Sequence, residues 1–196
     1  MKAIKTLGTA LFVGSLAFSG SSLAGDASAE ALSYTCAGCH GTNGASVGPA
    51  SPSLAGMSAV YLADSMRAFK SGERESTIMM RIAKGYDDDD FDKMAEFFAA
   101  QEIHFADQPA GKMAKKGAKL HDKYCDKCHA ENGTDPEDES GQLAGQWTTY
   151  LRYQMEDVKD GSRDTGKKML RQVEKMLKKE GDAAFEALLD HYASQK

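Results

Sequence analysis

Two short segments of the chain combine cysteine and histidine in the same order. Cys36-Ala37-Gly38-Cys39-His40 recurs as Cys125-Asp126-Lys127-Cys128-His129, and together they contain all four cysteines of the sequence. Cys-x-x-Cys-His is the attachment signature of c-type haem, in which the thiols form thioethers and the histidine ligates iron. A redox dithiol or half of a zinc site also uses Cys-x-x-Cys, but neither explains a histidine that follows at once in both copies. The motifs therefore predict two covalent haems.

The opposite axial ligand of each iron must come from farther along the chain. Methionine is the soft, neutral ligand that raises the reduction potential of a haem. Met79 and Met169 follow the motif histidines by 39 and 40 residues, and each stands two residues before an arginine. Because these positions are equivalent, we expect the ligand pairs His40 with Met79 and His129 with Met169. Met80 remains an alternative to Met79.

Three further histidines have no repeat partner, namely His104, His121 and His191. His121 lies four residues before Cys125, on the helix expected to lead into the second motif, where exposure to solvent is usual. We therefore expect all three to be surface or structural residues.

A tandem repeat organises the chain. The motif recurs at a shift of 89 residues, from Cys36 to Cys125, and Leu-Ala-Gly at 54–56 recurs at 143–145 with the same shift. Several landmarks in one order at one spacing indicate a duplication of one haem-binding module.

Both copies are expected to be helical. Apolar residues recur at helical spacing, and no run of alternating β-branched residues predicts a sheet. One helix is expected to lead into Cys125, and another to run from a Ser58 cap to Gly72. A third should end at Gly161, a fourth should begin after the acidic run 87–90, and a fifth should begin at Asp182. The prediction is an all-α fold of two tandem class I cytochrome c domains related by pseudo-twofold symmetry.

The amino terminus resembles a secretory signal. Lys2 and Lys5 precede an apolar run at 7–18, and Ser22-Leu23-Ala24 provides small residues for cleavage. The expected organisation is a signal peptide at 1–24, one domain at 25–106 and a second at 107–196, with the linker at 107–111. The apolar run is too short for a comfortable membrane anchor, so we expect a periplasmic protein.

Charge is distributed unevenly between the two copies. Loss of Lys2 and Lys5 changes the net charge from −5 to −7, and this acidity argues against nucleic acid as a partner. Residues 26–106 carry 12 acidic and 6 basic side chains, whereas residues 107–196 carry 17 and 16. The first copy therefore holds most of the net negative charge.

With these residues placed, the chain resembles the dihaem cytochrome subunit of flavocytochrome c sulfide dehydrogenase, a relative of the cytochrome c4 family. The resemblance is carried by the segments 36–57, 69–86, 117–129, 143–151 and 180–196. It implies haems close enough to exchange electrons, and an FAD-bearing flavoprotein partner that oxidises sulfide. It also places the methionine ligands on Met79 and Met169. Met80 stands where the family tends to have glycine, and the expected proline is missing before Met169.

The leading hypothesis is therefore electron transfer, without substrate chemistry, from the flavoprotein to a soluble acceptor such as a small cytochrome. The first alternative is a free-standing shuttle of the cytochrome c4 type. A dihaem peroxidase or thiosulfate dehydrogenase is a third, which the paired methionines disfavour. We also expect the uncharged segment Ser46–Met57 of the first domain to dock the flavoprotein, unless it only packs over its haem.

Overall fold

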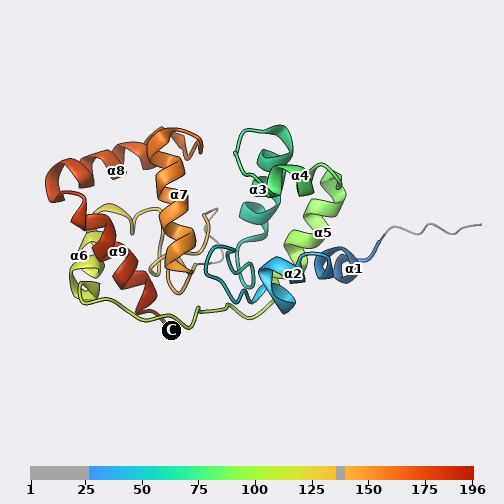
Figure 1. Cartoon of the computed structure of the whole chain (residues 1–196), viewed down its shortest axis with the longest axis horizontal. Helices are drawn as coiled ribbons and strands as arrows, with labels where there is room; N and C mark the ends of the chain where they lie inside the picture. Colours follow the sequence, from blue (N-terminus) through green and yellow to red (C-terminus); the bar gives the residue numbers. More distant parts are fainter. Residues whose placement is uncertain (1–26, 136–139) are drawn as a thin grey trace, which may run out of the picture.

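A computed structural model of the chain describes residues 27–135 and 140–196. The expected signal peptide and the acidic residues 137–139 lie outside the described residues. In the described part all regular elements are helices, apart from one isolated antiparallel bridge between Arg74 and Arg163. The chain forms two helical halves side by side, joined by an extended segment along one edge (Figure 1). The all-α prediction is confirmed.

The first half packs its helices around one apolar core. Its elements are α1 (Ala29–Tyr34), α2 (Ala37–His40), η1 (Thr42–Gly44), α3 (Ala59–Ser71), α4 (Met79–Ala83) and α5 (Asp88–Ala99). Helix α3 packs against α4 and α5, and α1 packs against α5. The core contains Leu32, Leu62, Phe91, Met94 and Phe98.

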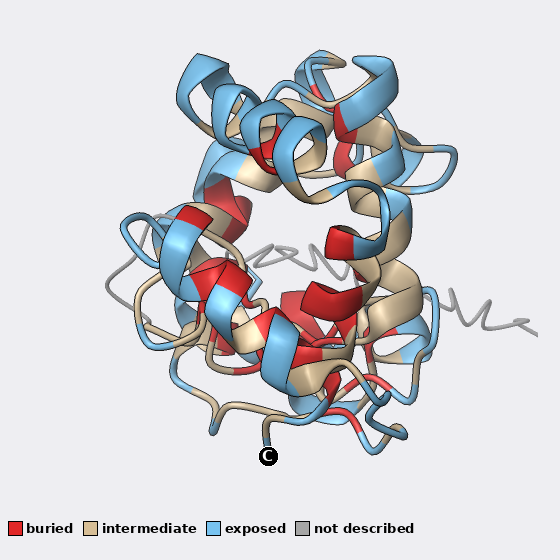
Figure 2. Cartoon of the chain, turned by 90° about the vertical axis from the view of Figure 1, so that its left-hand side faces the viewer, coloured by how far each residue is buried: buried red, intermediate tan, exposed pale blue. Residues whose placement is uncertain are grey.

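The second half has its own core. Its helices are α6 (Ala114–Tyr124), α7 (Thr148–Asp160), α8 (Gly166–Glu180) and α9 (Ala183–Ala193). Helices α6 and α9 have the most extensive packing, and they meet at Gly117, where any Cβ would overlap the backbone of Ala187. The core contains Leu120, Leu151, Met176, Leu188 and Tyr192. Buried residues line the inner faces of the helices, and exposed residues cover the outside (Figure 2).

Most of the expected helix ends are present. Ser58 Oγ accepts a hydrogen bond from Tyr61 N–H at the start of α3, and Gly72 ends that helix at φ +88°. Gly161 ends α7 in the same left-handed conformation, at φ +85°, which glycine adopts without the penalty of a Cβ. Asp182 precedes α9, but its side chain makes no capping hydrogen bond.

Two expectations for the second half were incomplete. The lysine-rich stretch after Gly166, for which no helix was expected, forms the 15-residue helix α8, which contains Met169. His121, which was expected to be exposed, is buried, with 1% of its surface accessible, and His191 is a buried structural residue at 5%. His121 Nδ1 lies 3.0 Å from Tyr192 Oη, and His191 Nε2 lies 2.8 Å from Asn132 Oδ1. Burial of these two imidazoles is tolerated because most of their nitrogen atoms have a hydrogen-bond partner.

The segment Ser46–Met57 packs against the second half. The amide of Gln146, fully buried, accepts from Ser53 N–H and donates to Ser53 C=O, both at 3.0 Å. Trp147 Nε1–H donates to the carbonyl of Ser46 at 3.1 Å. Ser46 and Ser53 of this segment therefore form an interdomain contact. Val47, which is 86% exposed, and the exposed residues Pro49 and Ala50 keep the surface that the docking hypothesis requires.

Candidate functional site

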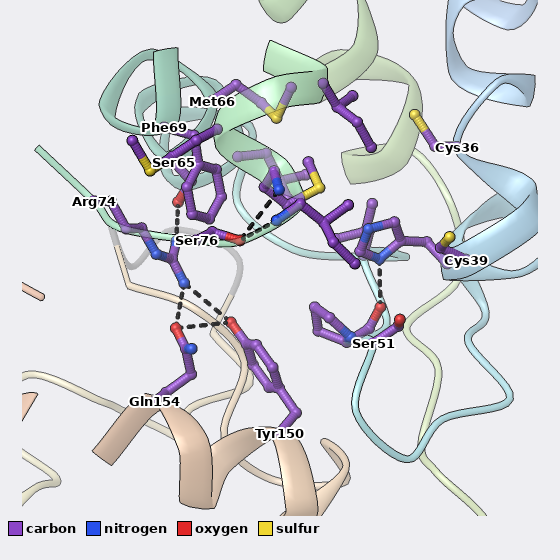
Figure 3. A pocket seen from close by; sticks show the side chains of 18 of the residues that line it. Cys36, Cys39, Ser51, Ser65, Met66, Phe69, Arg74, Ser76, Tyr150 and Gln154 are labelled. Carbon is purple, nitrogen blue, oxygen red and sulfur yellow. Dashed lines mark hydrogen bonds between the residues drawn. The ribbon is translucent and has the colours of Figure 1, made fainter. Parts of the chain in front are cut away.

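A large cavity of about 930 Å³ opens in the first half, beside the first Cys-x-x-Cys-His motif. Cys36 and Cys39 lie on one side of it (Figure 3), and His40 also lines it. The other walls are mainly apolar and include Met66, Phe69, Phe91, Met94 and Phe98. The volume is at the upper end of the range, roughly 300–1,000 Å³, that is usual for cofactor sites.

His40 is held in one orientation at the cavity wall. Its Nδ1 lies 2.8 Å from the carbonyl oxygen of Pro52, and because a carbonyl can only accept, Nδ1 must carry the proton. The other nitrogen, Nε2, then presents a lone pair. Burial lowers the pKa of His40, and the hydrogen bond to Pro52 offsets this only in part. His40 is therefore a neutral imidazole with the tautomer that a metal ligand requires.

Met79 and Met80 both line the same cavity. Met79 begins helix α4, and its N–H donates to Ser76 Oγ at 3.1 Å. The methyl of Met80 lies near the end of α3, 3.8 Å from the position that a Cβ on Gly72 would take. The structure thus places both Met79 and its alternative Met80 at the cavity that His40 lines.

The second motif follows α6. Cys125 is half-buried and Cys128 is exposed, and none of the four cysteines forms a disulfide. Burial raises the pKa of Cys125 to about 11. His129 Nδ1 lies 3.1 Å from Ser140 Oγ, whose own proton points to the carbonyl of Cys128. The hydroxyl oxygen therefore accepts from His129, as the carbonyl of Pro52 does from His40.

Met169 is half-buried in the first turn of α8. A small cavity of about 140 Å³ lies where α7, α8 and α9 meet, and its walls include Met155, Val173 and Met176. Neither His129 nor Met169 is among the described residues that line this small cavity.

Sequence reasoning missed the polar end of the large cavity. Arg74 lies there, only 8% exposed, together with Tyr150 and Gln154 from the second half (Figure 3). The sequence held a signal for them, because Arg74 and Arg163, like Tyr61 and Tyr150, are related by the repeat shift of 89.

The cavity matches the chemistry of a haem. It offers two free thiols and a neutral histidine on one side, a methionine on another, apolar walls for a macrocycle, and a buried cation for an anionic substituent. When bound, haem supplies an iron that gains and loses one electron at a time. The chain's residues hold it, and their apolar side chains exclude water from it.

Comparison with known proteins agrees with this geometry. The family model described as Cytochrome c matches residues 26–102. Cytochrome c4 of Pseudomonas aeruginosa is 30% identical over 177 residues, which cover 85% of this chain and 88% of that protein. The cytochrome subunit of sulfide dehydrogenase from Chlorobaculum tepidum is 46% identical over only 69 residues, 35% of this chain and 62% of that protein.

The fold is similar to a solved structure of the same kind. Reduced recombinant cytochrome c4 from Pseudomonas stutzeri superposes with a TM-score of 0.73 at 26% identity, over 86% of this chain and 97% of that one. Two tandem cytochrome c domains and two covalent c-type haems follow from this similarity together with the two motifs. The chain belongs to the cytochrome c4 family of dihaem c-type cytochromes, which carry electrons.

Proposed function

We propose that this chain is a free-standing electron shuttle of the cytochrome c4 type, which accepts single electrons from one protein and delivers them to another. The observation that carries the proposal is similarity to cytochrome c4 over nearly the whole of both chains, in sequence and in fold. This reverses the order of the two leading hypotheses from the sequence.

The proposed ligand sets are supported by the two motifs and, for the first haem, by the lining of the large cavity. Cys36 and Cys39 attach one haem, and Cys125 and Cys128 attach the other. His40 with Met79, and His129 with Met169, are the proposed axial ligands. Pro52 and Ser140 orient the two imidazoles, and a methionine opposite each histidine would close the iron to substrates, as a carrier requires.

A second candidate function is the cytochrome subunit of an FAD-containing sulfide dehydrogenase. The 46% identical match to such a subunit favours it, although that match covers only a third of this chain. In this case the chain would receive electrons from a flavoprotein and pass them to a small soluble cytochrome. For either function we place the protein in the periplasm and the domain boundary at 106/107. None of the helices in the described residues has the length and apolar character needed to cross a bilayer.

The two functions differ in what the protein binds. Holoprotein purified from its native source at moderate salt should elute at the mass of one chain, with two haems and no FAD, if it is a free shuttle. Co-elution of stoichiometric FAD, together with haem reduction on addition of sulfide, would instead establish the subunit role. Titration with reduced and oxidised carriers from the same cells would then identify the donor and acceptor.

A further inference from the structure

The two repeats keep the same side chains where the domains meet. Tyr61 and Arg74 of the first repeat correspond to Tyr150 and Arg163 of the second. Arg163 donates to Tyr61 Oη at 3.2 Å, and Arg74 donates to Tyr150 Oη at the same distance. Each arginine therefore bonds the tyrosine of the other domain, so the pairing is crossed.

The repeats differ in the last helix of each domain, where it passes the haem motif. Gly56 N–H donates to the carbonyl of Phe98 at 2.9 Å. Its counterpart Gly145 donates to the carbonyl of Tyr192 at 2.8 Å. Phe98 and Tyr192 therefore occupy equivalent positions, and the second repeat has a hydroxyl where the first has none.

A second pair of equivalent positions differs in the same way. Leu32 and His121 each lie four residues before the first cysteine of their motif. Leu32 and Phe98 belong to the apolar core of the first half. In the second half, His121 Nδ1 lies 3.0 Å from Tyr192 Oη, and the two residues are 1% and 4% exposed. The second repeat thus buries a hydrogen-bonded polar pair at two positions that are apolar in the first.

The hydroxyl of Tyr192 also forms a hydrogen bond with the sulfur of Cys125. Burial raises the pKa of both groups, but this bond lowers the pKa of Cys125 and raises that of Tyr192, as expected where a hydroxyl donates to sulfur. Once the haem is attached, the sulfur is a thioether without a proton and can only accept. Tyr192 then remains the donor, and its oxygen accepts from Nδ1–H of His121.

A hydrogen bond to this sulfur acts on the haem that the sulfur holds. It directs the positive end of the O–H dipole toward the macrocycle, and ferric iron carries one positive charge more than ferrous iron. The bond therefore disfavours the ferric state. Hydrogen bonds around a haem are one of the means by which a protein sets its reduction potential.

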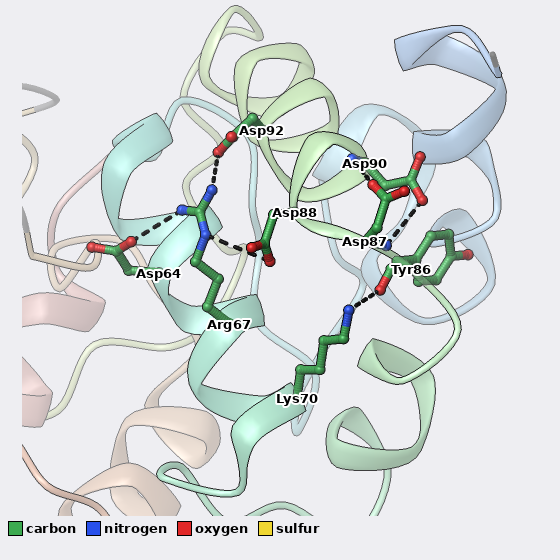
Figure 4. A network of polar contacts seen from close by, with 8 residues as sticks. All are labelled: Asp64, Arg67, Lys70, Tyr86, Asp87, Asp88, Asp90 and Asp92. Carbon is green, nitrogen blue, oxygen red and sulfur yellow. Dashed lines mark hydrogen bonds and ion pairs between the residues drawn. The ribbon is translucent and has the colours of Figure 1, made fainter.

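The first repeat has a hydroxyl near the corresponding sulfur, but its proton is directed elsewhere. Thr35 Oγ1 lies 3.8 Å from Cys36 Sγ, and it donates to the carbonyl of Leu32 at 2.6 Å. Tyr86 Oη lies 2.8 Å from the same hydroxyl and must therefore donate to it. Tyr86 stands beside Asp87 at the start of α5 (Figure 4). Thr35 thus has no proton left for a thioether at Cys36.

We infer that Tyr192 raises the reduction potential of the second haem by donating a hydrogen bond to the thioether sulfur of Cys125, and that His121 is the positioning residue that orients this hydroxyl. The inference rests on attachment of the second haem at Cys125, and it holds for a shuttle and for a flavocytochrome subunit alike. It gives two haems of duplicated modules different surroundings.

The test removes single hydroxyls from the holoprotein and measures both midpoint potentials by redox titration. Tyr192→Phe, which copies the first repeat, should lower one potential and leave the other unchanged. Tyr124→Phe is the matched control, because Tyr124 directly precedes Cys125 but donates its hydroxyl proton to Glu180 at 2.9 Å. It should leave both potentials as in wild type. Two haems per chain and both sulfur-to-iron absorptions should remain in each variant, since neither attachment nor axial ligation is changed.

Two substitutions at His121 separate orientation from packing. His121→Leu, the residue type of the first repeat, should lower the same potential as Tyr192→Phe, because the hydroxyl loses the donor that orients it. His121→Asn has an amide nitrogen that can donate in the place of Nδ1, and it should restore most of the shift. Equal shifts in His121→Leu and His121→Asn would contradict the role of His121.

Three results would overturn the role of Tyr192. The first is equal potentials in wild type and Tyr192→Phe, and the second is a shift of the same size in Tyr124→Phe. The third is a rise instead of a fall in Tyr192→Phe, because the hydroxyl oxygen, and not its proton, would then face the sulfur.

Discussion

At the scale of single residues, the two motif histidines differ in what orients them. A backbone carbonyl accepts from His40, whereas a serine hydroxyl accepts from His129. A carbonyl is fixed by the fold, but a hydroxyl can be removed by substitution. The basicity of a ligating imidazole depends on the hydrogen-bond partner of its other nitrogen. Substitution of Ser140 can therefore change the basicity of His129, whereas no side-chain substitution removes the carbonyl that orients His40.

The methionine ligand of the first haem can be identified by substitution. Met79→Leu should abolish the sulfur-to-iron charge-transfer absorption of one haem and lower its potential, because a ligand that favours ferrous iron is lost. Met80→Leu, the matched control one residue away, should retain the absorption. The reverse pattern would assign the ligand to Met80.

The second haem allows a different substitution. Met169→His should keep the haem attached and lower its potential, because imidazole favours ferric iron more than a thioether does. Haem staining of a denaturing gel checks attachment, and a redox titration measures the potential. Survival of both sulfur-to-iron bands would show that Met169 is not a ligand.

At the scale of elements, helix ends and inner faces were predictable. The ends at Ser58, Gly72 and Gly161 depend on local backbone chemistry, which is set by neighbouring residues. Helix α8 was not predicted, although Met169, Val173, Met176 and Leu177 recur at helical spacing. The basic residues between them are exposed, and Val173 and Met176 are buried. Its sequence thus carried the signal of an amphipathic helix, which was missed because the repeat was used only to place Met169 as a ligand.

The cap of α5 should be a local source of stability. Asp87 accepts from Asp90 N–H, and Asp90 reciprocates at the N–H of Asp87. Asp87→Ala should lower the free energy of unfolding by about 1 kcal/mol, the usual value of a lost cap. Asp89→Ala, an exposed neighbour with only a 3.9 Å contact to Lys93, should change it by much less. Guanidinium denaturation of the holoproteins measures both.

The packing of α9 should make the second domain sensitive to acid. Burial lowers the pKa of His191 below 6.5, and nearby His121 lowers it further. Because the folded pKa is below the unfolded one, this contribution to stability is complete above pH 6.5 and is lost as the pH falls through the folded value. Each unit of depression corresponds to about 1.4 kcal/mol.

His191→Gln should therefore flatten the fall in melting temperature between pH 7.5 and 5, measured by circular dichroism. His104→Gln, in the segment between the helices of the two domains, is the control and should leave the slope as in wild type. An unchanged slope in His191→Gln would contradict the assignment.

At the scale of the whole molecule, the duplication was visible in the sequence, but the way its halves meet was not. The shift of 89 identifies equivalent residues without saying which of them touch. The segment Ser46–Met57 illustrates this: its low charge suits a partner protein and an internal contact equally. Arg74 was overlooked for the same reason, because the sequence alone does not distinguish a buried arginine from a solvent-exposed one.

The bridge made by Gln146 should couple the unfolding of the two domains. Gln146→Ala leaves the buried N–H and C=O of Ser53 unpaired, at a cost of about 1–3 kcal/mol for each group. Trp147, the single tryptophan of the chain, lies at this contact and reports on it by fluorescence. We expect its transition in guanidinium to precede the loss of the sulfur-to-iron absorption of the haems in the variant and to coincide with it in wild type and in the control Gln172→Ala, on the exposed side of α8. Coincident transitions in all three proteins would show that Gln146 does not couple the domains.

The crossed pairing of Tyr61 and Arg74 with Tyr150 and Arg163 has an evolutionary consequence. A surface that meets its own equivalent is the defining property of an isologous dimer contact. A single ancestral module with this tyrosine and this arginine would already carry both sides of the joint, and could pair with another copy of itself. Gene fusion then made that encounter independent of concentration. The two copies are then constrained to evolve together, because a change at either arginine alters the contact that both haem domains share.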